Sequence, residues 1–326
     1  MLVIPETLLE AISFFSDPKI CFQFVSELRW ENGPQCPHCG STNVCKLSTR
    51  PGMRCRVKGC RKSFSIKVGT IFEDSPLPLT KWLPAIWIIV NSKTGVSSSE
   101  IARSLGVTQS TGWFMMHRIR EALRNELVYK LSGEVEIDQA YVGGKAKNKH
   151  RTHSPFRRRM STRETMTAIV GILQRRGEVR AKVIGDLRNS TIVPEIYRNV
   201  EDGARVYTDG RCSHYWLKSK YEHETVLHKK EYSRGKIHIN TIENFWSHFK
   251  RTLGTYIQIG PTHVERYLDE QAFRHNHRNE SDAERFVTAV SQIFGRRLTY
   301  AKLTGKTRRN MRSSSAHDDE ELHVGR

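Results

Sequence analysis

Four cysteines in two closely spaced pairs constrain the first part of this chain more than any other feature. The pairs are Cys36-Pro-His-Cys39 and Cys55-Arg-Val-Lys-Gly-Cys60, with fifteen residues between them. Pairs of this spacing in tight turns let four thiolates converge tetrahedrally, as a structural zinc ion requires. Gly40 gives the first turn the backbone freedom that it needs. We therefore predict one structural Zn²⁺ on these four cysteines. The other cysteines are expected to be small core residues: Cys21, Cys45 and Cys212.

The charge of the chain indicates a polyanionic partner. Lys and Arg number 53 against 34 Asp and Glu, which gives a formal net charge of +19. A charge this far positive is typical of proteins that bind nucleic acids. The longest apolar run, residues 83–90, spans eight residues, whereas a membrane-spanning helix needs about 20. The seven cysteines are clustered rather than spread as a disulfide framework, which favours a reducing compartment.

A helix-turn-helix module is predicted over residues 76–130, after a helical lead-in and zinc ribbon over residues 1–75. Residues 98–106 form a short helix pattern with serine caps and a glycine stop, and Thr108 caps a second helix pattern that ends at residue 123. The exposed start of such a second helix reads base edges. It carries Gln109, Ser110 and Thr111. Arg118 is expected further along the helix, near phosphates. An ordinary helical hairpin of the core is the alternative.

After Gly133 the pattern changes to short β-type runs mixed with helices. The expected strands cover residues 134–142, 165–173, 179–184 and 205–208, and the expected helices cover about 190–199, 240–253, 262–275 and 282–295. This mixture predicts an α/β domain over residues 131–300. The polar tail, residues 301–326, is expected to be disordered.

Three carboxylates of this domain could meet beside its sheet. The first predicted strand alternates, so Glu134, Glu136 and Asp138 share the face opposite the core. Asp209 ends another strand, and Glu243 lies on a helix with a strong apolar stripe. Convergent carboxylates suit Mg²⁺ or Mn²⁺, and two such ions can drive an in-line displacement at phosphorus. Acids at strand ends are commonly just solvated, so the spacing alone leaves both interpretations open.

Six stretches of the chain occur in an order typical of one family. They are TGWFMMHRIRE (111–121), EIDQAYVGGK (136–145), GEVRAKVI (177–184), VYTD (206–209), HINTIENFWSHFKR (238–251) and RYLDEQAFR (266–274). Together they resemble the insertion-sequence DDE transposases of the family numbered 1595, whose eukaryotic relatives are the Merlin transposases. The resemblance covers roughly residues 15–290, zinc ribbon included.

The resemblance implies an RNase H-like catalytic domain in which Asp138, Asp209 and Glu243 bind two Mg²⁺ or Mn²⁺ ions. It also implies that Lys250 contacts transposon-end DNA. Some relatives use Asn as the third ligand, which makes Asn240, one helical turn before Glu243, the alternative. Two positions depart from the family pattern, Gln139 and Gly210, where relatives often carry acidic residues. Neither belongs to the triad, so we expect weaker ion binding rather than loss of activity.

A strongly basic stretch follows the first catalytic strand. Residues 145–163 contain eight Lys or Arg and no acidic residue. Among them, Arg157, Arg158 and Arg159 are expected to contact the phosphate backbone of DNA. A solvated surface loop is the alternative.

These features predict a transposase that performs metal-dependent cleavage at element ends and strand transfer into target DNA. The metal-bound carboxylates suffice for this chemistry without a covalent protein intermediate. Two alternatives remain: a non-catalytic DNA-binding regulator derived from a transposase, and an RNase H-like nuclease. We expect a homo-oligomer on DNA with no membrane partner, in the cytoplasm or nucleoid of a bacterium or the nucleus of a eukaryote.

Overall fold

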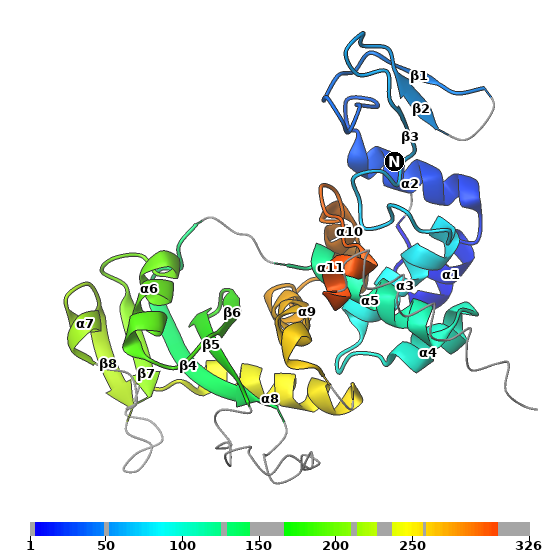
Figure 1. Cartoon of the computed structure of the whole chain (residues 1–326). Coiled ribbons are helices and arrows are strands. Elements are labelled where there is room, and N and C mark those ends of the chain that lie inside the picture. The colour runs from blue at the N-terminus through cyan, green and yellow to red at the C-terminus, as the bar shows by residue number, and fades with distance from the viewer. Residues whose placement is uncertain are drawn as a thin grey trace, which may run out of the picture. The chain divides into compact units, whose positions relative to one another are not determined.

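The computed structural model describes residues 4–48, 52–124, 129–143, 166–209, 214–226, 237–256 and 259–305. The chain divides into two compact units (Figure 1). The first unit comprises Met1–Ile89, Ser98–Ala122 and Asp282–Arg326, and the second comprises Val90–Ser97 and Leu123–Ser281. Within the described ranges, no helix is both long enough and apolar enough to span a membrane.

The first unit joins a small antiparallel sheet to a group of helices. The sheet has the order β1-β2-β3, with β1 at Val44–Lys46, β2 at Met53–Cys55 and β3 at Ser63–Phe64. The helices are α1 (Leu8–Phe14), α2 (Pro18–Arg29), α3 (Leu79–Asn91), α4 (Ser98–Leu105), α5 (Gln109–Ala122), α10 (Asp282–Ser291) and α11 (Tyr300–Thr304). The predicted helical lead-in is thus present as two helices.

The C-terminal helix α10 packs among the N-terminal helices. The Phe286 ring lies 5.4 Å from Phe15, 5.7 Å from Phe24 and 5.1 Å from Trp87, measured between ring centroids. Burial of these aromatic rings explains why the segment from Asp282 belongs to the first unit. The expected domain boundaries placed this segment with the α/β domain instead. Of the tail predicted to be disordered, residues 301–304 belong to α11 and residues 306–326 lie outside the described part.

The second unit is built on a mixed five-stranded sheet of order β6-β5-β4-β7-β8. The strands are β4 (Glu134–Val142), β5 (Thr167–Gln174), β6 (Val179–Ile184), β7 (Arg205–Asp209) and β8 (Glu222–Val226). β4, β5 and β6 pair antiparallel, whereas β7 runs parallel to β4 and β8 runs parallel to β7. The expected strands are confirmed. β8 was not expected, because three of its five residues are Glu or His and no apolar run marks it.

Helices cover both faces of this sheet. Helices α6 (Asn189–Asn199) and α7 (His214–Lys218) share one core with Val135, Ile137 and Val206, whereas α8 (Asn240–Thr255) and α9 (Val264–Asn276) share the other with Ile169 and Tyr207. Because side chains alternate along a strand, the acidic residues of β4 point toward the α8 face. The mixed α/β class is as predicted.

Candidate functional site

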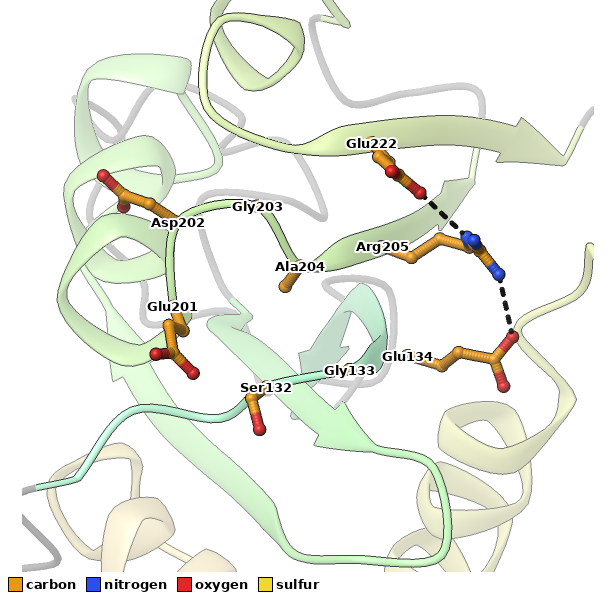
Figure 2. A pocket seen from close by; sticks show the side chains of 9 residues that line it. All are labelled: Ser132, Gly133, Glu134, Glu201, Asp202, Gly203, Ala204, Arg205 and Glu222. Atoms are coloured by element: carbon orange, nitrogen blue, oxygen red, sulfur yellow. Dashed lines mark hydrogen bonds and ion pairs between the residues drawn. The ribbon is translucent and has the colours of Figure 1, made fainter.

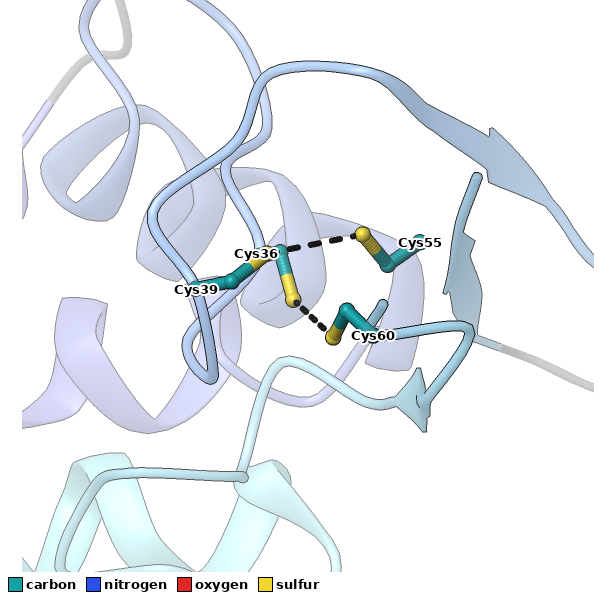
Figure 3. A group of neighbouring side chains, drawn as sticks. All are labelled: Cys36, Cys39, Cys55 and Cys60. Carbon is teal, nitrogen blue, oxygen red and sulfur yellow. Dashed lines mark hydrogen bonds between the residues drawn. The ribbon is translucent and has the colours of Figure 1, made fainter. Parts of the chain in front are cut away.

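The four predicted zinc ligands come together at the turns of the small sheet. The Sγ atoms of Cys36 and Cys60 are 3.8 Å apart and those of Cys39 and Cys55 are 3.6 Å apart (Figure 3). All four sulfur atoms lie within 4.8 Å of one another. Gly40 adopts φ of 72° and donates its N–H to the carbonyl of Cys36, which closes the first turn.

This geometry fits a structural zinc ion. Four sulfurs at about 2.3 Å from a tetrahedral zinc would lie about 3.8 Å from one another, close to the separations in the structure. Burial disfavours the Cys36 thiolate, but the N–H groups of His38 and Cys39 donate to its sulfur, and the pKa of Cys36 falls to about 7. Burial instead raises the pKa of Cys55 to about 12, so the geometry of the four sulfurs, rather than the ionisation of every thiol, is what fits zinc.

Helices α4 and α5 cross closely near their N-termini. A Cβ on Gly112 would lie 2.9 Å from the carbonyl oxygen of Ser98, so only glycine allows this approach. Gln109 and Ser110 are exposed at the start of α5, as predicted, whereas Thr111 is half-buried. The amide of Gln109 donates to the hydroxyl of Ser98 at 2.7 Å, and the Thr111 N–H donates to the Thr108 hydroxyl at 3.3 Å, which caps the helix.

The far half of α5 is buried, and this corrects the expectation for Arg118. Its side chain is only 5% exposed and donates to the carbonyl of Leu298 at 3.1 Å. The guanidinium also lies 4.6 Å from the centre of the Phe114 ring. The C-terminal segment of the first unit thus covers the surface that the sequence assigned to phosphates, and Arg118 is a core residue in this structure.

Asp138, in the middle of β4, and Asp209, the last residue of β7, lie side by side on two adjacent strands. β4 and β7 are parallel, and Ile137 pairs with Thr208, so the next residue of each strand is the aspartate. Neighbours in register on parallel strands point to the same face and lie about 4.8 Å apart. That face is the one covered by α8, where Glu243 lies in the first turn.

Electrostatic interaction shows that the third carboxylate lies near the first. Burial, followed by the negative charges of Asp209 and Glu243, raises the pKa of Asp138 to about 6. Among the described residues only the four cysteines bring ligand atoms within 4.8 Å of one another, so the carboxylates form a wider group.

A glycine of β5 lets α8 approach Asp138. Gly171 pairs directly with Asp138, and a Cβ there would lie 2.6 Å from Cζ2 of Trp246 and 3.0 Å from Cδ1 of Ile242. The Trp246 ring therefore occupies the space above Gly171. Because Trp246 lies one turn after Glu243, this contact sets the height of the helix over the sheet. A glycine inside an apolar strand run signals such an approach, although no role was predicted for Gly171.

Two of the remaining predicted site residues, Asn240 and Lys250, lie on α8. Asn240, the first residue of α8, and Lys250, two turns after Glu243, are both exposed. Arg157, Arg158 and Arg159 lie outside the described residues.

A pocket of about 400 Å³ lies at the opposite end of the same strands (Figure 2). Four carboxylates line it, those of Glu134, Glu201, Asp202 and Glu222. Arg205 pairs with two of them, Glu222 at 3.1 Å and Glu134 at 3.8 Å. The net negative charge of this pocket would repel a phosphate backbone. The pocket lies at the start of β4 and β7, and both strands run from it toward Asp138 and Asp209. We therefore do not assign a nucleic-acid site to this pocket.

Two family models match the chain. The model of the ISXO2-like transposase domain matches residues 130–276, which include all three carboxylates, and that of the transposase zinc-ribbon domain matches residues 17–63. The chain belongs to this transposase family, the insertion-sequence family numbered 1595. The transposase domain thus coincides with the sheet of the second unit, and the ribbon carries the cysteine cluster.

Two relatives match different shares of the chain. An uncharacterized protein in the transposable element ISH50 of Halobacterium salinarum is 27% identical over 271 residues, which are 79% of this chain and 90% of the relative. An uncharacterized transposase-like protein of Haemophilus influenzae is 33% identical over 117 residues, which are 36% of this chain and 93% of that relative. No solved structure matches the chain.

Proposed function

We propose that this protein is an active DDE transposase, which cleaves the ends of its element and joins them to target DNA. One observation carries the proposal. Asp138 and Asp209 directly follow the paired residues Ile137 and Thr208 of the parallel strands β4 and β7. The charge of Glu243 contributes to the raised pKa of Asp138. The transposase-domain match over residues 130–276 supports this assignment.

Asp138, Asp209 and Glu243 would hold two divalent ions, Mg²⁺ or Mn²⁺. Their carboxylate oxygens are the ligands that these ions prefer. Bound there, the ions would activate the attacking water or 3′-hydroxyl and stabilise the leaving oxygen. The residues themselves supply negative charge: burial raises the pKa of Asp138, and the charges of Asp209 and Glu243 raise it further. We also propose that the domain is RNase H-like, which its mixed sheet with helices on both faces supports.

DNA contacts are proposed in both units. Gln109, Ser110 and Thr111 at the start of α5 form the proposed base-reading surface of a helix-turn-helix. In the second unit, the exposed Lys250 on α8 is proposed to contact the element end, and the net charge of +19 supports DNA as the partner. Assembly of a homo-oligomer on two element ends belongs to the same proposal.

Conservative amide variants test the function directly. Asp138→Asn, Asp209→Asn and Glu243→Gln keep the size of each side chain but remove the charge that the ions need. Each should lower joining of a labelled pre-cut end to a target plasmid by more than about 100-fold, beyond the effect typical of outer-shell changes. Binding to end DNA should stay near that of the unaltered protein. Asp202→Asn, in an exposed turn at the opposite end of the sheet, is the matched control and should join normally.

The same assay separates the alternatives. Full joining by Asp209→Asn would exclude the proposed site, and a loss in Asn240→Ala as large as in Glu243→Gln would move the third ligand to Asn240. Unaltered protein that cleaves but never joins would be a nuclease. Unaltered protein that binds end DNA without cleavage in either Mg²⁺ or Mn²⁺ would be a regulator.

A further inference from the structure

A buried carboxylate on β4 contacts the start of α8 without belonging to the proposed metal site. Glu136 lies two residues before Asp138 on the same face of the sheet, and its side chain is fully buried. A carboxylate in such a place is costly unless charged and hydrogen-bonding partners surround it. The residues that partner Glu136 therefore indicate what it does.

The partners of Glu136 lie in the turn after β5 and around the start of α8, where Nδ1 of His238 is 3.4 Å from Oε1 of Glu136. Its Oε1 accepts from Nε of Arg175 at 2.8 Å and from the Thr241 hydroxyl at 3.1 Å. Its Oε2 accepts from the backbone N–H of Ile242 at 2.9 Å. The N-cap residue, Ile239, has no side chain able to cap the helix. Glu136 thus caps α8 from the sheet, where its charge also interacts favourably with the helix dipole.

Arg175 links the same carboxylate to the chain that leads into α8. Its guanidinium donates to the carbonyl oxygen of His238 at 2.7 Å and to Nδ1 of the same residue at 3.1 Å. It also lies 4.2 Å from the centre of the Tyr207 ring, and its side chain is 12% exposed. The strand β4, the turn after β5 and the entry to α8 are therefore joined by one charged network.

This network fixes the helix on one side of Glu243, and Gly171 with Trp246 fixes it on the other. Ile242 immediately precedes Glu243 and is held by Glu136, whereas Trp246 follows one turn later and packs over Gly171. Glu136 and Asp138 are separated by about 6.7 Å along the same strand. Contacts on both sides of Glu243 thus help to set its distance from Asp138.

We propose that Glu136 and Arg175 are positioning residues that hold Glu243 at the metal site. This inference rests on the proposed function, because it takes Glu243 as a metal ligand. The pair acts through the backbone of α8 and contacts no reacting atom. Loss of the pair should therefore impair ion binding while the three ligands remain in the chain.

Two variants separate positioning from stability. In Glu136→Gln, one carboxylate oxygen becomes an NH₂ group, which donates instead of accepting. At least one of the three groups that donate to Glu136 then faces another donor. The double variant Glu136→Met with Arg175→Met replaces the ion pair by apolar side chains of similar volume, which is often neutral for stability, but it cannot accept the Ile242 N–H. Glu195→Gln is the matched control, because Glu195 is an ion-paired carboxylate on α6, which packs on the other face of the sheet.

The readout is binding of Mn²⁺ to the zinc-loaded full chain, measured by calorimetry beside the melting temperature. Mn²⁺ affinity should fall about 10- to 100-fold in both variants, although the double variant melts near the unaltered protein. Glu195→Gln should bind normally. Hydroxyl-radical cleavage of the backbone by Fe²⁺ should cut near residues 138, 209 and 243 in the unaltered protein, and the cut near residue 243 should weaken in both variants.

Each outcome decides between the two proposals. If either folded variant binds Mn²⁺ as tightly as the unaltered protein and shows the same three cuts, the positioning role is wrong, whereas the metal site stands. Absence of Mn²⁺ binding and of all three cuts in the unaltered protein would overturn the metal site, and the positioning role with it.

Discussion

At the scale of single residues, the two ends of α5 differ: its start is exposed and is the proposed base-reading surface, whereas its second half is buried. Gln109 is exposed and Arg118 is buried on the same helix. We predict that Gln109→Ala lowers the preference for element-end over random DNA by about 10- to 100-fold, since one good base contact contributes about 1–3 kcal/mol of discrimination. Arg118→Gln should instead lower the melting temperature and leave the preference unchanged. Fluorescence anisotropy with both DNAs at several salt concentrations measures this. A preference lost only in Arg118→Gln would reverse the assignment.

The same scale shows what residue chemistry alone could predict. The cysteine pairs were recognisable because their ligands are local in sequence, and the structure brings them together as expected. The roles of Arg118 and Glu136 depend on segments far away in the chain, at Leu298 and Ile242. No local pattern carries that information, so one role was predicted wrongly and the other was not assigned.

At the scale of elements, the approach of α8 to the sheet depends on the missing side chain at position 171. We predict that Gly171→Ala destabilises the protein by about 1–3 kcal/mol, as overpacking of a core typically does, because Trp246 and Ile242 are both buried. It should also reduce joining, because α8 and Glu243 must move. Gly185→Ala is the control, since a Cβ there meets nothing within 4 Å. Chemical denaturation measures the first effect, and unchanged stability in Gly171→Ala would contradict the close packing. Trp246→Leu should partly restore the Gly171→Ala variant.

Element boundaries followed the sequence wherever apolar periodicity was strong. β4 and β6 begin and end at the predicted residues, and α8 extends the predicted helix by two residues. Polar β8 gave no such pattern, although its pairing with β7 supports the strand that ends in Asp209. Apolar patterns predict strands and helices that have a buried face. Whether a polar segment such as β8 forms a strand depends instead on its pairing with the neighbouring strand.

At the scale of the whole molecule, the C-terminal segment returns to the N-terminal helices, so the first unit is closed by residues from both ends of the chain. Sequence order suggested consecutive domains, because nothing local shows that Phe286 packs against Phe15, Phe24 and Trp87. These aromatic rings form a core in the first unit, and the five-stranded sheet of the second unit has a core on each face. We therefore expect the two units to unfold in two separate transitions.

The cysteine site gives a way to perturb one unit alone. We predict that Cys39→Ser, or removal of zinc by a chelator, lowers the melting temperature of the first unit strongly, because a structural zinc ion supplies folding free energy directly. The second unit contains none of the four ligands, so its transition should shift little. Scanning calorimetry should then show one displaced and one unchanged transition, and Mn²⁺ binding by the carboxylates should persist. Asp138→Asn provides the reverse control, since it should leave zinc content and the first transition unchanged. A single transition that shifts as a whole in Cys39→Ser would show that the two units unfold cooperatively, and an unchanged melting profile would refute the zinc site.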